Sequence, residues 1–167
     1  MKIKTPLYHG FGTYHAIEAP NHKPMETLKI LIAIDNNQSA HKIALNGFEL
    51  AKQLNAEIAM VSIVDADDGS TDDPPTPREL SEMMEHNLNR SQQSLIENIF
   101  KNTPVKCFVA TGKPYKVILE TAEKWGANII VMGTHGRKGL SHLLLGSVAE
   151  DVIRHAKKTV VVIPVTN

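Results

Sequence analysis

The sequence predicts an α/β protein with a doubly wound, five-stranded parallel sheet and helices on both of its faces. From Leu28 onward, five short runs of apolar, mostly β-branched residues alternate with segments of helical periodicity, a pattern typical of repeated βαβ units. The runs are largely apolar, as strands buried on both faces are. Because βαβ crossovers are right-handed, we expect a doubly wound sheet with ligands bound outside the carboxyl ends of its strands. The strand order that we expect is 3-2-1-4-5.

Each apolar run has the length of a strand, and the third is the weakest of the five. In chain order, the expected strands are Leu28 to Asp35, Ile58 to Val64, Val105 to Ala110, Ile129 to Gly133 and Thr159 to Ile163. Four helical segments join them, and in each one apolar residues recur at helical spacing, so that one stripe packs on the sheet. The predicted stripes are Ala44, Phe48, Ala51 and Leu54; Leu80, Met84, Leu88, Ser91, Leu95 and Ile99; Ile118, Leu119, Ala122 and Trp125; and Val152, Ile153 and Ala156.

Local signals mark where several of these helices begin and end. The first is expected over roughly Ala40 to Leu54. In the third, Pro114 suits the first turn and Gly126 is placed to end the helix. Ser147 and Glu150 match a capping box, which predicts a side-chain cap by Ser147 at the start of the fourth helix.

Length and composition favour one globular domain. The chain has 167 residues, of which 42% are apolar and 22% charged. Prolines and glycines interrupt residues 1–27, which we interpret as an N-terminal extension, and residues 28–167 form the domain. Acidic and basic residues balance at 18 each, so no net charge favours nucleic acid or an anionic membrane. No apolar stretch resembles a signal peptide or a membrane span, and we expect a cytoplasmic protein.

The sequence offers little for a metal site or a disulfide. Cys107 is the only cysteine and lies in an apolar run, which favours a buried free thiol. Five aspartates lie close together, but they lack the central glycine and terminal glutamate of a calcium loop, and we interpret them as a solvated acidic loop. These aspartates are Asp65, Asp67, Asp68, Asp72 and Asp73.

The segment after the fourth strand contains the residues that most strongly indicate a binding site. Glycines stand at the strand exit, Gly133, inside the loop, Gly136, and before the next helix, Gly146. Glycine lets several backbone N–H groups converge on phosphate oxygens, and a helix that begins at Ser147 adds free N–H groups and a positive dipole. The spacing matches neither a Walker loop nor the Gly-x-Gly-x-x-Gly of dinucleotide-binding domains.

This spacing resembles that of the universal stress protein family. Its nucleotide-binding members carry Gly-x-x-Gly, nine residues, and then Gly-Ser or Gly-Thr, which corresponds here to Gly133, Gly136, Gly146 and Ser147. The resemblance extends from about Leu28 to Val165 and implies a universal-stress-type nucleotide-binding domain over residues 28–167. One departure is the link from Asn36 to Lys42, which is one residue longer than usual and has Asn37 where serine is common.

The resemblance implies roles for particular residues. Asp35, which ends the first strand, would meet the ribose, and backbone at Ile63 would meet the adenine. An acid at the end of an apolar strand is costly to bury without a partner, which supports Asp35 independently, although it can also cap the next turn. The remaining implied contacts, to the ribose and phosphates, are Met132, Gly133, His135, Gly136, Arg137, Gly146, Ser147 and Val148.

Some of these residues have a second interpretation. Arg137 can add charge near a triphosphate or remain solvated in an exposed loop. His135 lacks a spaced second ligand and suits a structural role in the loop. A hydrolase that used Ser147, His135 and Asp35 together would lack the Gly-x-Ser-x-Gly elbow of known serine hydrolases. We therefore assign no catalytic residue.

The resemblance implies a stress-response protein that binds ATP, with Mg²⁺ or Mn²⁺, and acts as a nucleotide-dependent signalling or regulatory module. Slow ATP hydrolysis or autophosphorylation is the most catalysis that we expect. Relatives commonly dimerise through the last strand, here the apolar run Thr159 to Val165, which would otherwise leave an open sheet edge. The alternative is a homodimer of the same fold that binds a protein partner, still unknown, without nucleotide.

Overall fold

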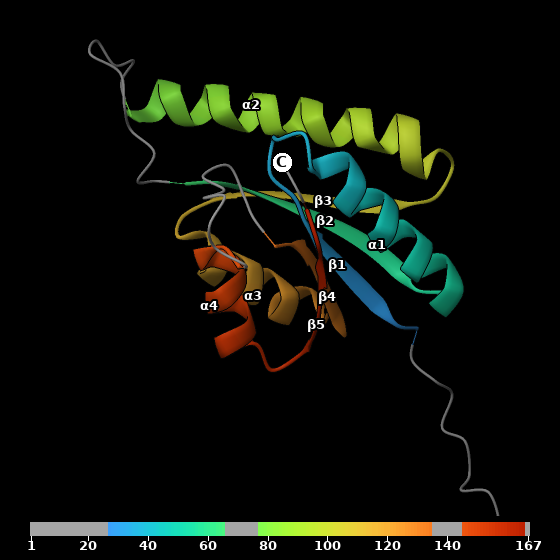
Figure 1. The fold of residues 1–167 in the computed structure, drawn as a ribbon. Helices are drawn as coiled ribbons and strands as arrows, with labels where there is room; N and C mark the ends of the chain where they lie inside the picture. Colours follow the sequence, from blue (N-terminus) through green and yellow to red (C-terminus); the bar gives the residue numbers. More distant parts are fainter. Residues whose placement is uncertain (1–26, 66–76, 135–144, 166–167) are drawn as a thin grey trace, which may run out of the picture.

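The computed structural model describes residues 27–65, 77–134 and 145–165 and contains the predicted sheet (Figure 1). All neighbouring strands are parallel, in the order β3-β2-β1-β4-β5, which confirms the expected topology. The strands are β1 (Lys29–Ala33), β2 (Glu57–Val64), β3 (Val105–Thr111), β4 (Ile129–Gly133) and β5 (Thr159–Ile163). β1, the most central strand, ends two residues earlier than predicted, although the N–H of Ile34 still donates to the carbonyl of Val61 at 3.0 Å.

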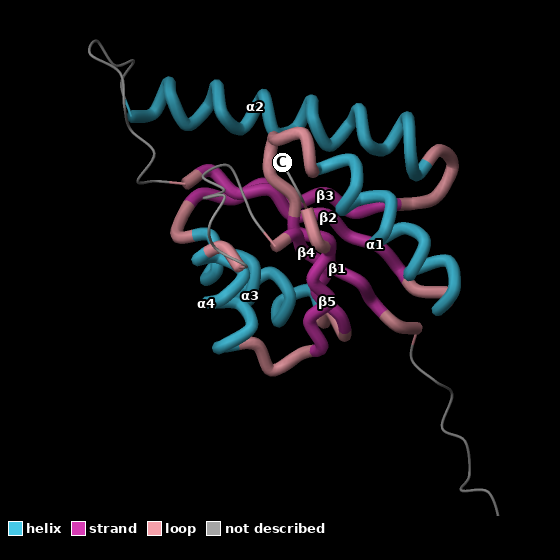
Figure 2. The backbone as a smooth tube through the Cα atoms, in the orientation of Figure 1, coloured by secondary structure: helices cyan, strands magenta, loops and turns pink. Residues whose placement is uncertain are grey.

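Helices cover both faces of the sheet (Figure 2). They are α1 (Ala40–Leu54), α2 (Pro77–Leu95), α3 (Pro114–Trp125) and α4 (Ser147–His155), and a π-helical turn, η1 (Ile96–Phe100), continues α2. α1 and α2 pack on one face, and α3 and α4 on the other, as a doubly wound sheet requires. Among the described residues, no helix is both long and apolar enough to cross a membrane.

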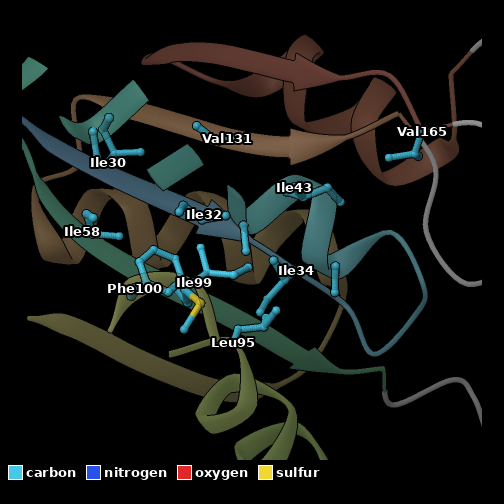
Figure 3. Packing of buried hydrophobic residues seen from close by; sticks show 14 residues of the cluster. Ile30, Ile32, Ile34, Ile43, Ile58, Leu95, Ile99, Phe100, Val131 and Val165 are labelled. Carbon is cyan, nitrogen blue, oxygen red and sulfur yellow. The ribbon is translucent and has the colours of Figure 1, made fainter. Parts of the chain in front are cut away.

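Alternate residues of β1 divide the core into two clusters. Ile30, Ile32 and Ile34 face α1 and the end of α2 (Figure 3), whereas Leu31 and Ala33 face α3 and α4. Successive side chains of a strand point to opposite faces, so a strand covered on both sides must be apolar at every position. This explains why the strands are continuous apolar runs, and why these runs were reliable signals.

Two predicted core positions are wrong because of helix geometry. Val152 is fully buried, but Ile153, the next residue of α4, is 47% exposed, because consecutive helical residues point about 100° apart and Ile153 lies beyond the buried stripe. Leu54, the last residue of α1, is 39% exposed because the helix ends there and the chain turns through Asn55 in the left-handed conformation. The buried stripe of α1 consists of Ala40, Ile43, Ala44, Gly47 and Ala51.

Cys107 is exposed, so the prediction of a buried thiol is wrong. The residue lies on β3, which is an edge of the sheet, and its register partner on β2 is the fully buried Met60. An apolar run indicates a strand but does not say whether that strand is central or at an edge. Partial desolvation of the thiol nevertheless raises the pKa of Cys107 above its ordinary value.

The predicted ends of α3 are confirmed. Pro114 stands in its first turn, and Gly126 ends it with φ +76°, a left-handed conformation that L-residues rarely adopt. The N–H of Gly126 donates to the carbonyl of Glu123 at 3.1 Å. Of the predicted acidic loop, Asp67, Asp68, Asp72 and Asp73 lie outside the described residues, as does the N-terminal extension up to residue 26.

Candidate functional site

The candidate site lies where the connections after neighbouring strands pass to opposite faces of the sheet. β1 is followed by α1 on one face of the sheet, whereas its neighbour β4 is followed by α4 on the other face. The two connections therefore diverge at the carboxyl ends of β1 and β4. In open parallel sheets, this switch point is the usual place for a bound ligand.

Strand register brings Asp35 to this switch point. Ala33 is paired with Val61, so two residues further along each strand Asp35 is level with Ile63. On the other side Ile32 is paired with Val131, which three residues further along brings Asp35 level with Thr134. Asp35 is partly buried, and its carboxylate accepts a hydrogen bond at Oδ2 from the Asn37 amide at 3.0 Å.

Three of the predicted contact residues share an apolar surface. Met132, which is buried, belongs to the cluster on the side of α3 and α4, and Ile63 and Val148 pack against that cluster. Ile63 comes from the end of β2, Met132 from β4 and Val148 from the first turn of α4. Segments far apart in the sequence thus contribute to one apolar region beside the switch point.

The glycine loop is closed at its base. The N–H of Gly146 donates to the carbonyl of Thr134 at 2.7 Å, which joins the two ends of the segment between them. Thr134 is itself tied to the chain at and after β5: its N–H donates to the carbonyl of Ile163 at 3.0 Å, and its hydroxyl accepts the N–H of Val165 at 3.0 Å. Gly133 and Gly146 therefore lie at the two ends of a loop that is hydrogen-bonded across its base.

The start of α4 differs from the prediction. Gly146 is the cap residue, its carbonyl accepts the N–H of Glu150 at 2.9 Å, and there is no side-chain cap, so the predicted capping box is wrong. Ser147 is instead the first helical residue and is exposed. The Glu150 carboxylate contacts Arg154 at 2.6 Å, one helical turn further on.

Gly146 has φ −74° and ψ 156°, which is ordinary extended backbone. Glycine is therefore not needed here for its dihedral freedom. What Gly146 provides is the absence of a side chain beside the first N–H groups of α4. Those groups have no helical partner and carry the positive end of the helix dipole, so they suit an anion.

Part of the predicted site lies outside the described residues. His135, Gly136 and Arg137 belong to the segment 135–144, so the structure does not test their roles. Asp35 and Ser147 are described and lie at the same edge of the sheet, but the histidine of the hydrolase hypothesis is not. Across the described residues, no group of three or more His, Cys, Asp or Glu is arranged to hold a metal ion.

Two residues at this edge were missed from the sequence. Asn37 contacts the Asp35 carboxylate, and a signal for it exists, because Asp-x-Asn before a helix favours local side-chain turns. Thr134 anchors the loop to β5 through a contact 31 residues away in the chain. Such a contact leaves no local pattern, so single-sequence reasoning could not find it.

Comparison with known proteins agrees with this architecture. Residues 26–164 match the model of the universal stress protein family. The chain is 30% identical over 152 residues to universal stress protein MJ0577 of Methanocaldococcus jannaschii, an alignment that covers 81% of this chain and 93% of that protein. The solved structure of MJ0577 superposes with a TM-score of 0.70 at 28% identity, covering 84% of this chain and 97% of the other.

Two more distant solved structures share the fold and contain nucleotides. A universal stress protein in complex with cAMP has a TM-score of 0.58 at 18% identity, covering 84% of this chain and 98% of its own. The universal stress protein from Archaeoglobus fulgidus in complex with dAMP has a TM-score of 0.56 at 19% identity, covering 83% and 98%. The family model spans nearly the whole described chain, and the topology agrees with it, so this chain belongs to the universal stress protein family.

Proposed function

We propose that this chain belongs to the ATP-binding, glycine-motif subgroup of its family and acts in the cytoplasm as a nucleotide-dependent regulatory module. In this proposal, residues 28–167 form the nucleotide-binding domain and residues 1–27 an extension. The ligand is an adenine nucleotide, ATP with Mg²⁺ or Mn²⁺ being the expected form. The contact residues are those predicted from the sequence, from Asp35 and Ile63 to the glycine loop and Val148.

The observation that carries the proposal is the meeting of three kinds of group at the switch point. The carboxylate of the partly buried Asp35 can accept hydrogen bonds from ribose hydroxyls, and the apolar region that includes Ile63 and Met132 suits a base. The start of α4, beside Gly146, offers N–H groups to phosphate oxygens. A nucleotide requires one acceptor, one apolar surface and one anion site, and these are the three features present.

The relatives support the same ligand class. The cAMP and dAMP of the two complexes both contain adenine and a phosphate, which makes an adenine nucleotide the natural candidate for this chain. The spacing from Gly133 to Ser147 supports a phosphate site in the loop. Any Mg²⁺ or Mn²⁺ would be held chiefly by the phosphates, as is usual for magnesium in nucleotide sites.

Binding, rather than turnover, is the activity that the site supports. In this proposal the N–H groups at the start of α4 serve phosphate binding, and we assign no described residue to positioning an attacking water molecule. Ser147 is exposed and lies beside the free N–H groups at the start of α4. Its hydroxyl can contact a phosphate there without taking part in a reaction.

Calorimetric titration with ATP and Mg²⁺ tests the proposal, using a Gly146→Val variant. The backbone at Gly146 is compatible with valine, so the new side chain should crowd the phosphate site without backbone strain. We expect the parent to bind and the variant to lose at least tenfold in affinity. Replacing the glycine at the N-cap should lower the free energy of unfolding by about 1 kcal/mol. Gly126→Ala is the matched control, because it lowers stability by a similar amount.

Gly126 has φ +76° at the opposite, amino edge of the sheet, and alanine there costs about 1 kcal/mol without touching the site. The control should therefore bind ATP like the parent. No binding by the parent would instead favour the nucleotide-independent, partner-binding alternative. Steady formation of ADP would instead indicate that the protein is an ATPase.

We also propose a homodimer formed through the last strand, Thr159 to Val165. β5 is an edge of the sheet, and Val160, Val161, Val162 and Ile163 are only partly buried within one chain. An apolar edge of this kind is normally covered or paired. Sedimentation equilibrium should give twice the monomer mass of 18.4 kDa at micromolar concentration, and a monomeric mass there would contradict this part of the proposal.

A further inference from the structure

The side chain of Asn37 joins the end of β1 to the start of α1. Its amide nitrogen donates to Oδ2 of Asp35 at 3.0 Å, and its amide oxygen accepts the backbone N–H of Ser39 at 2.7 Å. The Asn37 carbonyl also accepts the N–H of Ala40 at 3.1 Å, so the residue stabilises this turn through its backbone as well. Asn37 is half-buried, unlike the exposed Asn36 beside it.

These contacts allow the Asn37 amide only one orientation. A backbone N–H only donates and an ionised carboxylate only accepts, so the amide oxygen must face Ser39 and the NH₂ group must face Asp35. In the flipped orientation, the amide NH₂ would face the Ser39 N–H and the amide oxygen would face the Asp35 carboxylate, so neither hydrogen bond could form. One carboxylate oxygen of Asp35 is therefore held by a group whose own orientation is already determined.

Helix α1 anchors this arrangement to the core. Ser39, at the N-cap position, has helical dihedrals and makes no side-chain cap, so the Asn37 side chain accepts a hydrogen bond at the helix start instead. The first residues of the helix are buried, with Ala40 and Ile43 only 5% and 2% exposed. Packing of α1 on the sheet thus determines where the Asn37 amide lies.

We propose that Asn37 is a positioning residue, which holds the Asp35 carboxylate in the orientation that accepts hydrogen bonds from the ribose hydroxyls of a nucleotide. This inference rests on the proposed function and specifies how its acidic group recognises the sugar. A carboxylate held before binding loses less rotational freedom when the ligand arrives.

Two variants separate positioning from turn formation. Asn37→Ala removes both side-chain hydrogen bonds. Asn37→Asp keeps an oxygen for the Ser39 N–H but replaces the donor to Asp35 with a like charge. Asn36→Ala is the matched control, because it changes the same residue type at the next position, where the side chain is exposed.

The first measurement is made on the nucleotide-free protein. Three-bond couplings across χ1 of Asp35 should indicate a single rotamer in the parent and in Asn36→Ala, and rotamer averaging in Asn37→Ala. An Asp35 side chain that keeps one rotamer in both Asn37 variants would overturn the positioning role. This result does not depend on whether the protein binds a nucleotide.

The second measurement compares ATP with 2′,3′-dideoxy-ATP by calorimetry. Loss of a hydrogen bond that orients a charged acceptor should weaken ATP binding by roughly tenfold in both Asn37 variants. Binding of the dideoxy nucleotide, which has no ribose hydroxyl to donate, should change by less than about twofold. Asn36→Ala should alter neither affinity.

An equal loss of affinity for both nucleotides in the Asn37 variants would overturn the proposal, because the effect would then come from a disturbed turn and not from sugar recognition. A parent that binds neither nucleotide would overturn the proposed function and the ribose role together. The couplings would then still establish whether Asn37 orients Asp35.

Discussion

At the scale of single residues, position in the sheet changes the chemistry of a side chain more than its sequence neighbours do. Cys107 and Met60 are register partners on adjacent strands, yet Met60 is fully buried and Cys107 is exposed. The difference arises because β3 is an edge and β2 is not. Exposure makes the thiol accessible, while its partial desolvation disfavours the thiolate.

We therefore expect slow alkylation of Cys107 in the folded protein at neutral pH. Its pKa is raised by desolvation, so at pH 8 the folded chain has a smaller thiolate fraction than the unfolded chain, and the difference closes only as the pH rises above the folded pKa. Iodoacetamide labelling followed by mass spectrometry checks this, since the chain has one cysteine. A folded protein that reacts as fast as the urea-unfolded protein at pH 8 would contradict it.

At the scale of helices and strands, regular elements were predictable and irregular ones were not. The bounds of α1, β4 and β5 agree with the sequence prediction, because helical periodicity marks α1 and continuous apolar runs mark the two strands. The π-helical turn η1 was not predicted. Neither was Gln92, which is fully buried in α2 and donates to the Ser62 hydroxyl at 3.0 Å. A buried polar contact between elements interrupts the apolar pattern instead of contributing to it.

Helix α1 approaches β1 closely at Gly47, which yields a prediction about packing. A Cβ at this position would lie 2.6 Å from Cδ1 of Ile32, which is fully buried. We expect Gly47→Ala to destabilise the protein by about 1 kcal/mol, because overpacking of about 1–3 kcal/mol exceeds the gain of about 1 kcal/mol in helix propensity. Urea unfolding measures the change.

A double-mutant cycle identifies the cause. Ile32→Val removes the clashing Cδ1 and by itself costs about 0.5–1.5 kcal/mol. In the Ile32→Val background, Gly47→Ala should cost less than in the parent, because only the contact with the Cγ1 position, 2.9 Å from the new Cβ, remains. If Gly47→Ala costs the same in both backgrounds, the contact with Ile32 is not the source of the effect.

At the scale of the whole molecule, the order of elements determines where the site lies. The sequence predicted the sheet order, and it predicted the carboxyl edge as the binding edge because right-handed crossovers between buried parallel strands favour a doubly wound sheet with ligands at that edge. It also predicted Asp35 and Gly146 at that edge. The capping of α4, the Thr134 anchor and the role of Asn37 depend on side-chain contacts made only after the chain has folded, and periodicity does not encode them.

We expect an adenine nucleotide to bind at the switch point between β1 and β4. Titration of the ¹⁵N-labelled protein with ATP and Mg²⁺, followed through its amide resonances, locates the bound nucleotide. Saturable shifts are expected at Asp35, Ile63, Gly146, Ser147 and Val148, whereas amides at the amino edge, such as Gly126, should stay unchanged. Shifts that gather away from the carboxyl ends of β1 and β4, or a spectrum that ATP leaves unaltered, would show that no nucleotide binds at this switch point.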